Sequence, residues 1–229
     1  MTDQSGETPE YALLSSVFHR RHSCRAFRAD PVAPADLDRM VRLASRAASW
    51  CNTQPWHLSI AGPVTTNHLR RDLAACARHG PGEREIMPEP HYQGVYLDRR
   101  RLAGWRLYEH IGIAKGDRGA SREQALRNFD FFGAPQIAVV SCDRALGPYG
   151  MVDCGAFVCA FLLAAETLGL GAIALASVVS YPGVLRRYLP VPADNAIVCA
   201  IAFGHERDDP VNAFRTNRAT IDEFCTLTD

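Results

Sequence analysis

Apolar residues near the start of the chain recur at the spacing of an α-helix. The stretch from Tyr11 to Phe18 places apolar side chains three and four residues apart and stops at the basic sequence RRHSCRAF, residues 20–27. A second helix is predicted within residues 31–48, because Pro and Asp mark its start and one face is apolar, carrying Leu37, Met40, Val41 and Ala44. A third helix is predicted from Val64 to Arg78.

Short apolar runs predict strands between these helices. The candidates are WHLSIAG (56–62), PQIAVVSCD (135–143), GAIALASVV (171–179) and NAIVCAIAFG (195–204). The second and fourth are almost continuously apolar and rich in β-branched residues, which is typical of strands buried on both faces. Strands that alternate with helices, including a short one at 181–189, predict an α+β fold of mixed α/β layers.

The longest apolar helix is predicted at residues 151–168. It has almost no polar face, so it must be buried on every side, either at the centre of the fold or at a subunit interface. Its small residues Gly155, Ala156 and Ala160 would let another helix approach closely. Periodicity alone leaves both interpretations open.

The middle of the chain has a different composition. Residues 79–93 are rich in Gly, Pro and charge and predict a loop, whereas residues 95–128 are basic and weakly helical. We therefore expect a variable segment at about 79–130 within one domain that spans residues 1–229.

Charge and composition restrict the possible partners. The 229 residues include 25 basic and 25 acidic side chains, so no long-range field attracts nucleic acid or anionic lipid, and any anion must be bound locally. The first ten residues do not resemble a secretory signal, and the longest apolar stretch is interrupted by Glu166 and is too short to span a bilayer. We expect a cytoplasmic protein with no membrane or nucleic-acid partner.

The cysteines do not indicate disulfides or a metal site. Eight cysteines are scattered along the chain, several lie in apolar runs, and none forms a CxxC pair. Reduced cysteines that pack as small core side chains are the better interpretation, and no metal is expected.

The basic sequence RRHSCRAF has two interpretations. Basic residues suit the negative end of a helix dipole, so the cluster could be a solvated helix end, which is the better interpretation of one cluster alone. Alternatively, Arg21, Arg25 and Ser23 could bind an anion such as a phosphate, where each charge-assisted hydrogen bond contributes about 1.5–3 kcal/mol.

A second polar segment, AASWCNTQPWHL, covers residues 47–58. Its uncharged donors and acceptors, among them Ser49, Asn52 and Gln54, stand beside two tryptophans and a proline. This pattern is adequate for a helix end, a turn and a strand start. It also suits a planar heterocycle with polar edges.

Four stretches taken together resemble the nitroreductase family of FMN-binding flavoproteins. They are RRHSCRAF (20–27), ASWCNTQPWHL (48–58), VDCGAFVCAFLLAAETLGLGA (152–172) and FRTNRA (214–219), and they occur in the family's order. Two departures are Ala48, where Pro is common, and IALAS at 173–177, which replaces a segment with Pro and Gln. The resemblance implies a central antiparallel or mixed sheet flanked by helices, in an intertwined homodimer.

The resemblance also implies a role for particular residues toward FMN. The phosphate and ribityl chain would be held by Arg21, His22, Ser23 and Arg25, completed by Arg218 with Arg215 as a helper. The second subunit would supply Ala48, Ser49 and Asn52, and the isoalloxazine would lie beside Leu175, Ala176 and Ser177. The helix at 151–168 would then pack against its symmetry mate. No side chain is assigned a catalytic role, because the cofactor carries the chemistry.

The implied activity is an FMN-dependent oxidoreductase that uses NADH or NADPH to reduce nitroaromatics, quinones or a related electron-poor small molecule. Since the sequence has no GxGxxG motif, the nicotinamide nucleotide would enter and leave the same pocket before the acceptor, a ping-pong sequence. Arg99, Arg100 and Arg101 could attract an anionic substrate or form a solvated helix face. Alternatives are a dehalogenase, dehydrogenase or flavin-processing enzyme of the same fold, or a flavin-binding protein without turnover.

Overall fold

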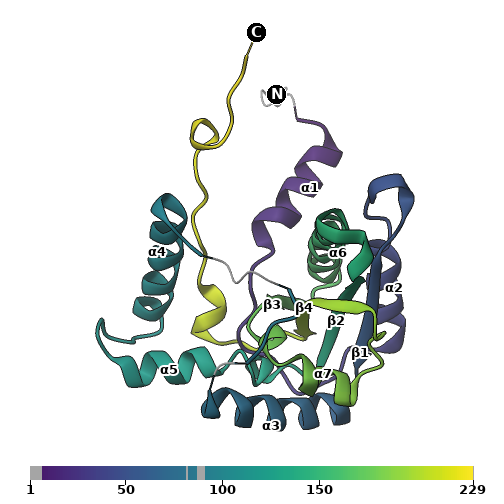
Figure 1. Cartoon of the computed structure of the whole chain (residues 1–229). Coiled ribbons are helices and arrows are strands. Elements are labelled where there is room, and N and C mark those ends of the chain that lie inside the picture. Colours follow the sequence, from purple (N-terminus) through teal and green to yellow (C-terminus); the bar gives the residue numbers. More distant parts are fainter. Residues whose placement is uncertain (1–6, 81, 87–90, 229) are drawn as a thin grey trace.

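The computed structural model describes residues 7–80, 82–86 and 91–228. Within them lie seven α-helices and four strands (Figure 1). The helices are α1 (Pro9–Arg20), α2 (Pro34–Ala44), α3 (Pro63–His79), α4 (Gly94–His110), α5 (Arg118–Leu126), α6 (Gly147–Thr167) and α7 (Pro182–Tyr188). The strands are β1 (Trp56–Ala61), β2 (Gln136–Asp143), β3 (Gly171–Leu175) and β4 (Asn195–Gly204). Part of the predicted loop at 79–93, residues 81 and 87–90, lies outside the described residues.

The four strands form one antiparallel sheet in the order β1-β2-β4-β3. The predicted α+β fold is confirmed. The two strands expected to be buried on both faces, β2 and β4, are the two central ones, with only Asp143 of β2 exposed. Strand β3 lies at one edge, where its single named-strand neighbour is β4.

Side chains alternate between two apolar cores, one on each face of the sheet. On one face Val139 and Ile197 pack with Leu69 of α3 and Leu185 of α7. On the other face the neighbouring residues pack against α2 and α6, in a cluster that includes Val140, Ile201, Met40, Phe157 and Phe161. The period of two along each strand therefore produces three layers, helices over sheet over helices (Figure 1). Each fully buried aromatic side chain contributes about 1.5–3 kcal/mol to this packing.

Helix α6 combines a buried face with an exposed apolar face. Phe157 and Phe161 are buried against the sheet, whereas Val152 is 66% exposed, and Ala156 and Cys159 are exposed on the other side. By length and composition the helical stretch 144–167 could cross a membrane. It is longer than the apolar run that we judged too short from the sequence, because the helix begins well before that run. In the described structure the buried face of this helix supplies the core of one sheet face, so the fold accounts for the apolar character of that face.

The segment at about 79–130 that we expected to be variable contains two separate helices, where the sequence indicated one weakly helical stretch. Helix α4 stands away from the sheet. The C-terminal segment, residues 205–228, runs alongside it, and α5 leads back toward α3 (Figure 1). No residue of α4 or α5 is buried, which explains their weak apolar periodicity. One other prediction needs correction: the stretch 171–179, predicted as a strand or a strand end, is a strand only to Leu175 and is followed by a 3₁₀ turn at 178–180.

The cysteines are also more varied than expected. Cys24, Cys142 and Cys154 are buried thiols, and burial raises the pKa of Cys154 to about 12. The prediction that the cysteines pack in the core is wrong for three exposed residues, Cys51, Cys159 and Cys225.

Glu85 fastens the described part of the 79–93 loop to the sheet. Its carboxylate accepts two hydrogen bonds from Arg186, at 2.8 and 3.1 Å, and one from the backbone N–H of Ile197 at 2.9 Å. Arg144 adds an ion pair at 3.4 Å. Burial would raise the pKa of Glu85, but these hydrogen bonds and the charges of Arg186 and Arg144 together lower it.

We therefore expect Glu85→Gln to lower the free energy of unfolding by about 1.5–3 kcal/mol at neutral pH, measured by urea unfolding. Because folding lowers the pKa of Glu85, the stabilisation is complete above about pH 4.3 and is lost as the pH falls through the folded-state pKa. The gap between wild type and E85Q should shrink over that range. Asp30→Asn is the control, since both partners of the Arg28–Asp30 pair are exposed, and it should cost less than about 1 kcal/mol. A gap that does not change with pH would contradict this role.

Candidate functional site

A cavity of about 560 Å³ lies between the end of α1 and the C-terminal segment. Both elements extend from the same side of the sheet (Figure 1). Six of the residues expected to hold a phosphate and its attached chain line this cavity: Arg21, His22, Ser23, Arg25, Arg215 and Arg218. The two sequence motifs that supply them are almost two hundred positions apart, so folding alone brings them together.

The first wall of the cavity is fixed by the end of α1 and by strand β3. The backbone N–H of Arg21 donates to the carbonyl of Val17 at 2.9 Å and ends the helix. Beyond it the chain is extended, with Ser23 bridged to Ala172 of β3 in parallel, and the N–H of Cys24 donates to the carbonyl of Ala172 at 3.2 Å. The arginines therefore stand at the outer edge of β3.

The second wall is attached to the first by Asn212, whose side chain is buried (4% exposed). Its Oδ1 accepts from the backbone N–H of Arg25 at 2.6 Å. Its Nδ2 donates to the carbonyls of Ala26 at 2.9 Å and Arg207 at 3.0 Å. Because one amide satisfies three backbone groups from two distant segments, it sets how the walls face each other. Sequence analysis missed this residue, since a lone Asn in a polar tail carries no signal.

The basic cluster divides into a solvated part and a part that faces the cavity. Arg20 pairs with Glu166 of α6 at 3.0 Å and is more than half exposed, as expected for a helix end. Arg25 is half-buried and donates to the carbonyl of Ser23 at 3.1 Å, with Phe214 at 5.9 Å from its guanidinium carbon to the ring centroid. Among the described residues neither Arg21 nor Arg25 has a carboxylate partner.

Burial lowers the pKa of Arg25, because a cation is disfavoured away from water, but arginine remains protonated at neutral pH. Burying a charge without a counter-ion destabilises a protein unless a ligand supplies that counter-ion. Among the described residues, Arg215 and Arg218 bond only to neutral oxygens of their own segment: Arg215 to the carbonyls of Asn212 and Phe214, and Arg218 to those of Thr216 and Asn217 and to the Thr216 hydroxyl. Four guanidinium groups thus line one cavity, and among the described residues none of them is paired with a carboxylate.

His22 lines the cavity, but its ring nitrogens already have partners. Nδ1 contacts the carbonyl of Arg20 at 3.0 Å, and Nε2 lies 3.2 Å from the carboxylate of Glu206. Its position therefore suits a wall of the cavity more than a free donor. Phe18, His19, Phe214 and Thr216 also line the cavity without having been predicted.

The predicted ring-side residues lie along the open edge of β3. Leu175 is buried (1% exposed), whereas Ala174 and Ala176 are exposed and leave room beside the backbone. From Ala172, which is bridged to Ser23, to Leu175 the strand advances about 10 Å, at about 3.3 Å per residue. The hydroxyl oxygen of Ser177 is buried without a hydrogen-bond partner in the described structure. A phosphate-bearing molecule that lies along this edge fits these residues.

The residues predicted to come from the second subunit, Ala48, Ser49 and Asn52, do not line the cavity of their own chain. Ser49 accepts from the backbone N–H of Gln54 at 3.0 Å, and Ala48 and Asn52 are exposed. The loop is held to α6 by Asp153, which accepts from the N–H of Trp50 at 3.1 Å. Cys51, Asn52 and Gln54 have positive φ angles, a costly backbone conformation for residues with a Cβ. This exposed loop is therefore held against α6 in a strained conformation, and its predicted residues do not line the cavity of their own chain.

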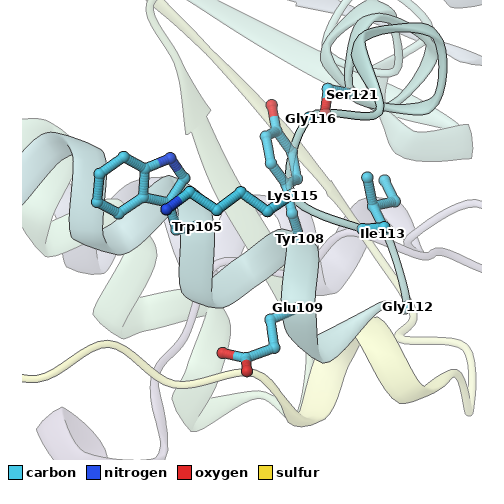
Figure 2. A pocket seen from close by; sticks show the side chains of 9 residues that line it. Trp105, Tyr108, Glu109, Gly112, Ile113, Lys115, Gly116 and Ser121 are labelled. Atoms are coloured by element: carbon cyan, nitrogen blue, oxygen red, sulfur yellow. The ribbon is translucent and has the colours of Figure 1, made fainter.

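A second cavity, of about 530 Å³, lies between the end of α4 and the start of α5 (Figure 2). The side chain of Lys115 extends toward Trp105, with its ammonium nitrogen 5.2 Å from the ring centroid, while Glu109 points away. No residue predicted to bind a cofactor lines this cavity. One ammonium group stacked on an indole suits a phosphate less well than four arginines do. Among the described residues no group of His, Cys, Asp or Glu side chains is arranged to hold a metal.

Comparison with known proteins identifies the family. The model of the nitroreductase family matches residues 19–205, so the chain belongs to this family. It is 29% identical over 228 residues to a 4-nitrobenzoate reductase from Nocardioides sp., covering 96% of this chain and 91% of that one. It is 28% identical to the nitroreductase NfnB of Mycolicibacterium smegmatis, covering 96% and 94%.

Solved structures agree with the sequence relatives. The FMN-dependent nitroreductase NfnB from Mycobacterium smegmatis, in complex with NADPH, superposes with a TM-score of 0.88 at 27% identity, over 95% of this chain and 99% of that one. The FMN and NADPH-dependent NfnB from Sphigopyxis sp. strain HMH gives 0.88 at 28% identity, over 94% and 99%.

Because the arginines of the cavity have no carboxylate counter-ion among the described residues, inorganic phosphate should stabilise the protein once bound small molecules are removed. We expect phosphate to raise Tm relative to chloride at matched ionic strength, and Arg25→Met to remove most of that shift. Arg39→Met, an exposed α2 residue paired with Asp36, is the control and should keep the shift. An equal phosphate effect on R25M and wild type would show that Arg25 does not bind the anion.

Proposed function

We propose that this member of the nitroreductase family is an FMN-dependent oxidoreductase that uses NAD(P)H to reduce nitroaromatics, quinones or related electron-poor small molecules. The observation that supports it most directly is Arg25, half-buried and without a carboxylate partner among the described residues, in a cavity whose lining residue Ser23 is bridged to Ala172 of the edge strand β3. The relatives named above are 4-nitrobenzoate and FMN-dependent nitroreductases, which supports the same activity.

In this proposal the arginines hold the FMN phosphate from two chain segments. Arg21 and Arg25 approach from the end of α1, and Arg218 from the C-terminal segment, with Ser23 and Arg215 lining the two walls beside them. Each charge-assisted bond contributes about 1.5–3 kcal/mol, so the cluster favours the phosphate strongly over water. His22 completes the wall, held in place by Glu206.

The edge of β3 would position the ring. Ala174 and Ala176 offer no bulk, so the backbone beyond Leu175 is open to a flat molecule, and Ser177 has an unused hydroxyl oxygen nearby. When bound, FMN supplies hydride acceptance and donation. The chain itself contributes orientation and positive charge, and no side chain is required as a general base.

A homodimer would account for the exposed apolar face of α6 and for the loop that does not reach the cavity of its own chain. The exposed small residues of α6, including Gly155 and Ala156, form an apolar face that a second α6 could cover. Such pairing would also carry the loop with Ala48, Ser49 and Asn52 toward the other subunit's ring site. The exposed free thiols favour a reducing compartment, so we propose that the enzyme acts in the cytoplasm.

The activity is tested on the purified protein with NADPH and 4-nitrobenzoate. We expect a yellow protein with about one FMN per chain, bleaching of the flavin absorbance on anaerobic addition of NADPH, and parallel lines in double-reciprocal initial-rate plots. Parallel lines are expected because both substrates would use the same site, beside the edge of β3, in turn.

Each part of this experiment can fail separately. Bound FMN without bleaching by either nucleotide would indicate a flavin-binding protein without turnover, and intersecting lines would exclude the ping-pong sequence. Bleaching with no reduction of a nitro compound, but loss of halide from a halogenated phenol, would favour a dehalogenase of the same fold.

The dimer is tested by Ala156→Arg. A cation on this face of α6 would be buried without a partner if two copies pack there, so we expect a monomer by sedimentation equilibrium and a loss of most bound FMN. Val64→Arg, at an exposed site on α3, should stay dimeric and yellow. An A156R protein that remains dimeric would place the interface elsewhere.

A further inference from the structure

A second basic groove adjoins the proposed phosphate site. It has a volume of about 280 Å³ and lies between α4 and the C-terminal segment, which run side by side (Figure 1). We call it the α4 groove. One wall is a single face of α4 with Arg99, Leu102 and Arg106, spaced three and four residues apart, and the other includes Phe214 and Arg218. Phe214, Thr216 and Arg218 also line the neighbouring cavity, so the two spaces adjoin along these residues.

The arginines of the α4 groove differ in whether their charge is balanced. Arg99 donates to Glu223 at 2.9 Å. The pKa of Glu223 is lowered by the backbone N–H of Thr220, which donates at 2.9 Å, and by Arg99, so this carboxylate stays ionised and neutralises Arg99. The Arg99–Glu223 ion pair thus connects the C-terminal segment to α4.

Arg106 and Arg218 keep an unbalanced charge. Arg218 donates only to neutral oxygens of its own segment, and Arg106 has no ion-pair partner in the part of the chain that the structure describes. Arg218 stands where the two spaces meet, and its guanidinium has five donors that can serve anions on both sides. The α4 groove therefore presents two positive charges beside aliphatic and aromatic surface, a combination that suits a phosphorylated nucleoside.

The proposed function supplies a candidate with that chemistry. A nicotinamide that approaches the ring along β3 must leave its adenosine half outside the ring site, and NADPH carries on that half a 2′-phosphate that NADH lacks. We propose that the α4 groove binds the adenosine half of NADPH, with Arg106 and Arg218 pairing with the 2′-phosphate. This inference rests on the proposed function and deepens it, because it predicts preference for NADPH and assigns that preference to Arg106.

The test measures binding to the FMN-loaded protein by calorimetry, with adenosine 2′,5′-bisphosphate and adenosine 5′-monophosphate as probes. We expect the wild type to bind the bisphosphate more tightly, and Arg106→Ala to weaken it at least about tenfold while changing the monophosphate less than about twofold. Arg106→Lys should recover part of the loss. The control is Arg101→Ala on the same helix, an exposed residue that does not line the α4 groove.

Steady-state kinetics separate this inference from the proposed function. In R106A, KM should rise for NADPH and not for NADH, at unchanged FMN content. Equal binding of the two probes by wild type, or an equal effect of R106A on both, would overturn the assignment of the groove. A rise in KM for 4-nitrobenzoate instead of NADPH would also overturn it and leave the oxidoreductase activity standing. A protein that binds the bisphosphate through Arg106 but is never reduced by NADPH would contradict the proposed function alone.

Discussion

The site depends on a single buried amide. Asn212 joins the backbone of Arg25 and Ala26 to that of Arg207, and so holds the end of α1 against the C-terminal segment. Together with the backbone hydrogen bonds that join Ala26 and Arg28 to Arg207 and His205, this link places the arginines of the two segments around one cavity. The consequence is a half-buried arginine that has no carboxylate partner among the described residues, an arrangement that is unfavourable until an anion arrives. In the proposed function, the phosphate of the cofactor would neutralise this charge.

Sheet topology leaves the strand beside the cavity at an edge of the sheet. The order β1-β2-β4-β3 buries the two most apolar strands and leaves β3 at an edge, where Ser23 and Cys24 pair with it from outside. An open strand edge normally invites aggregation, and proteins cover such edges. Here small residues keep the edge accessible next to the basic cluster, which is the geometry expected for a cofactor that runs from a phosphate site along a strand.

Much of this arrangement could be predicted from the sequence. Strands β2 and β4 are continuously apolar, and helices α2 and α6 have clear signals, so the layers followed from local patterns. The basic cluster could not be divided by sequence alone: Arg20 is a solvated helix end and Arg25 faces the cavity, yet they are five residues apart. The difference depends on Glu166, Asn212 and Phe214, which come from other parts of the chain and carry no local pattern.

Two further features depend on tertiary structure. Strand β3 ends at Leu175, although apolar residues continue to Val179, because the chain turns there and Val178 and Val179 pack into the core. The loop with Ala48, Ser49 and Asn52 stays away from the cavity of its own chain, so its proposed role can be completed only by a second subunit. Sequence similarity to a family suggests such a role, but a single chain's contacts do not supply it.

The most direct test of the central claim compares FMN with riboflavin, which has the same ring and ribityl chain but no phosphate. If the arginines at the end of α1 and in the C-terminal segment hold the phosphate, fluorescence titration of the cofactor-free protein should show FMN binding at least about a hundredfold more tightly than riboflavin. Equal affinities would mean that these arginines do not bind the phosphate and would contradict the account.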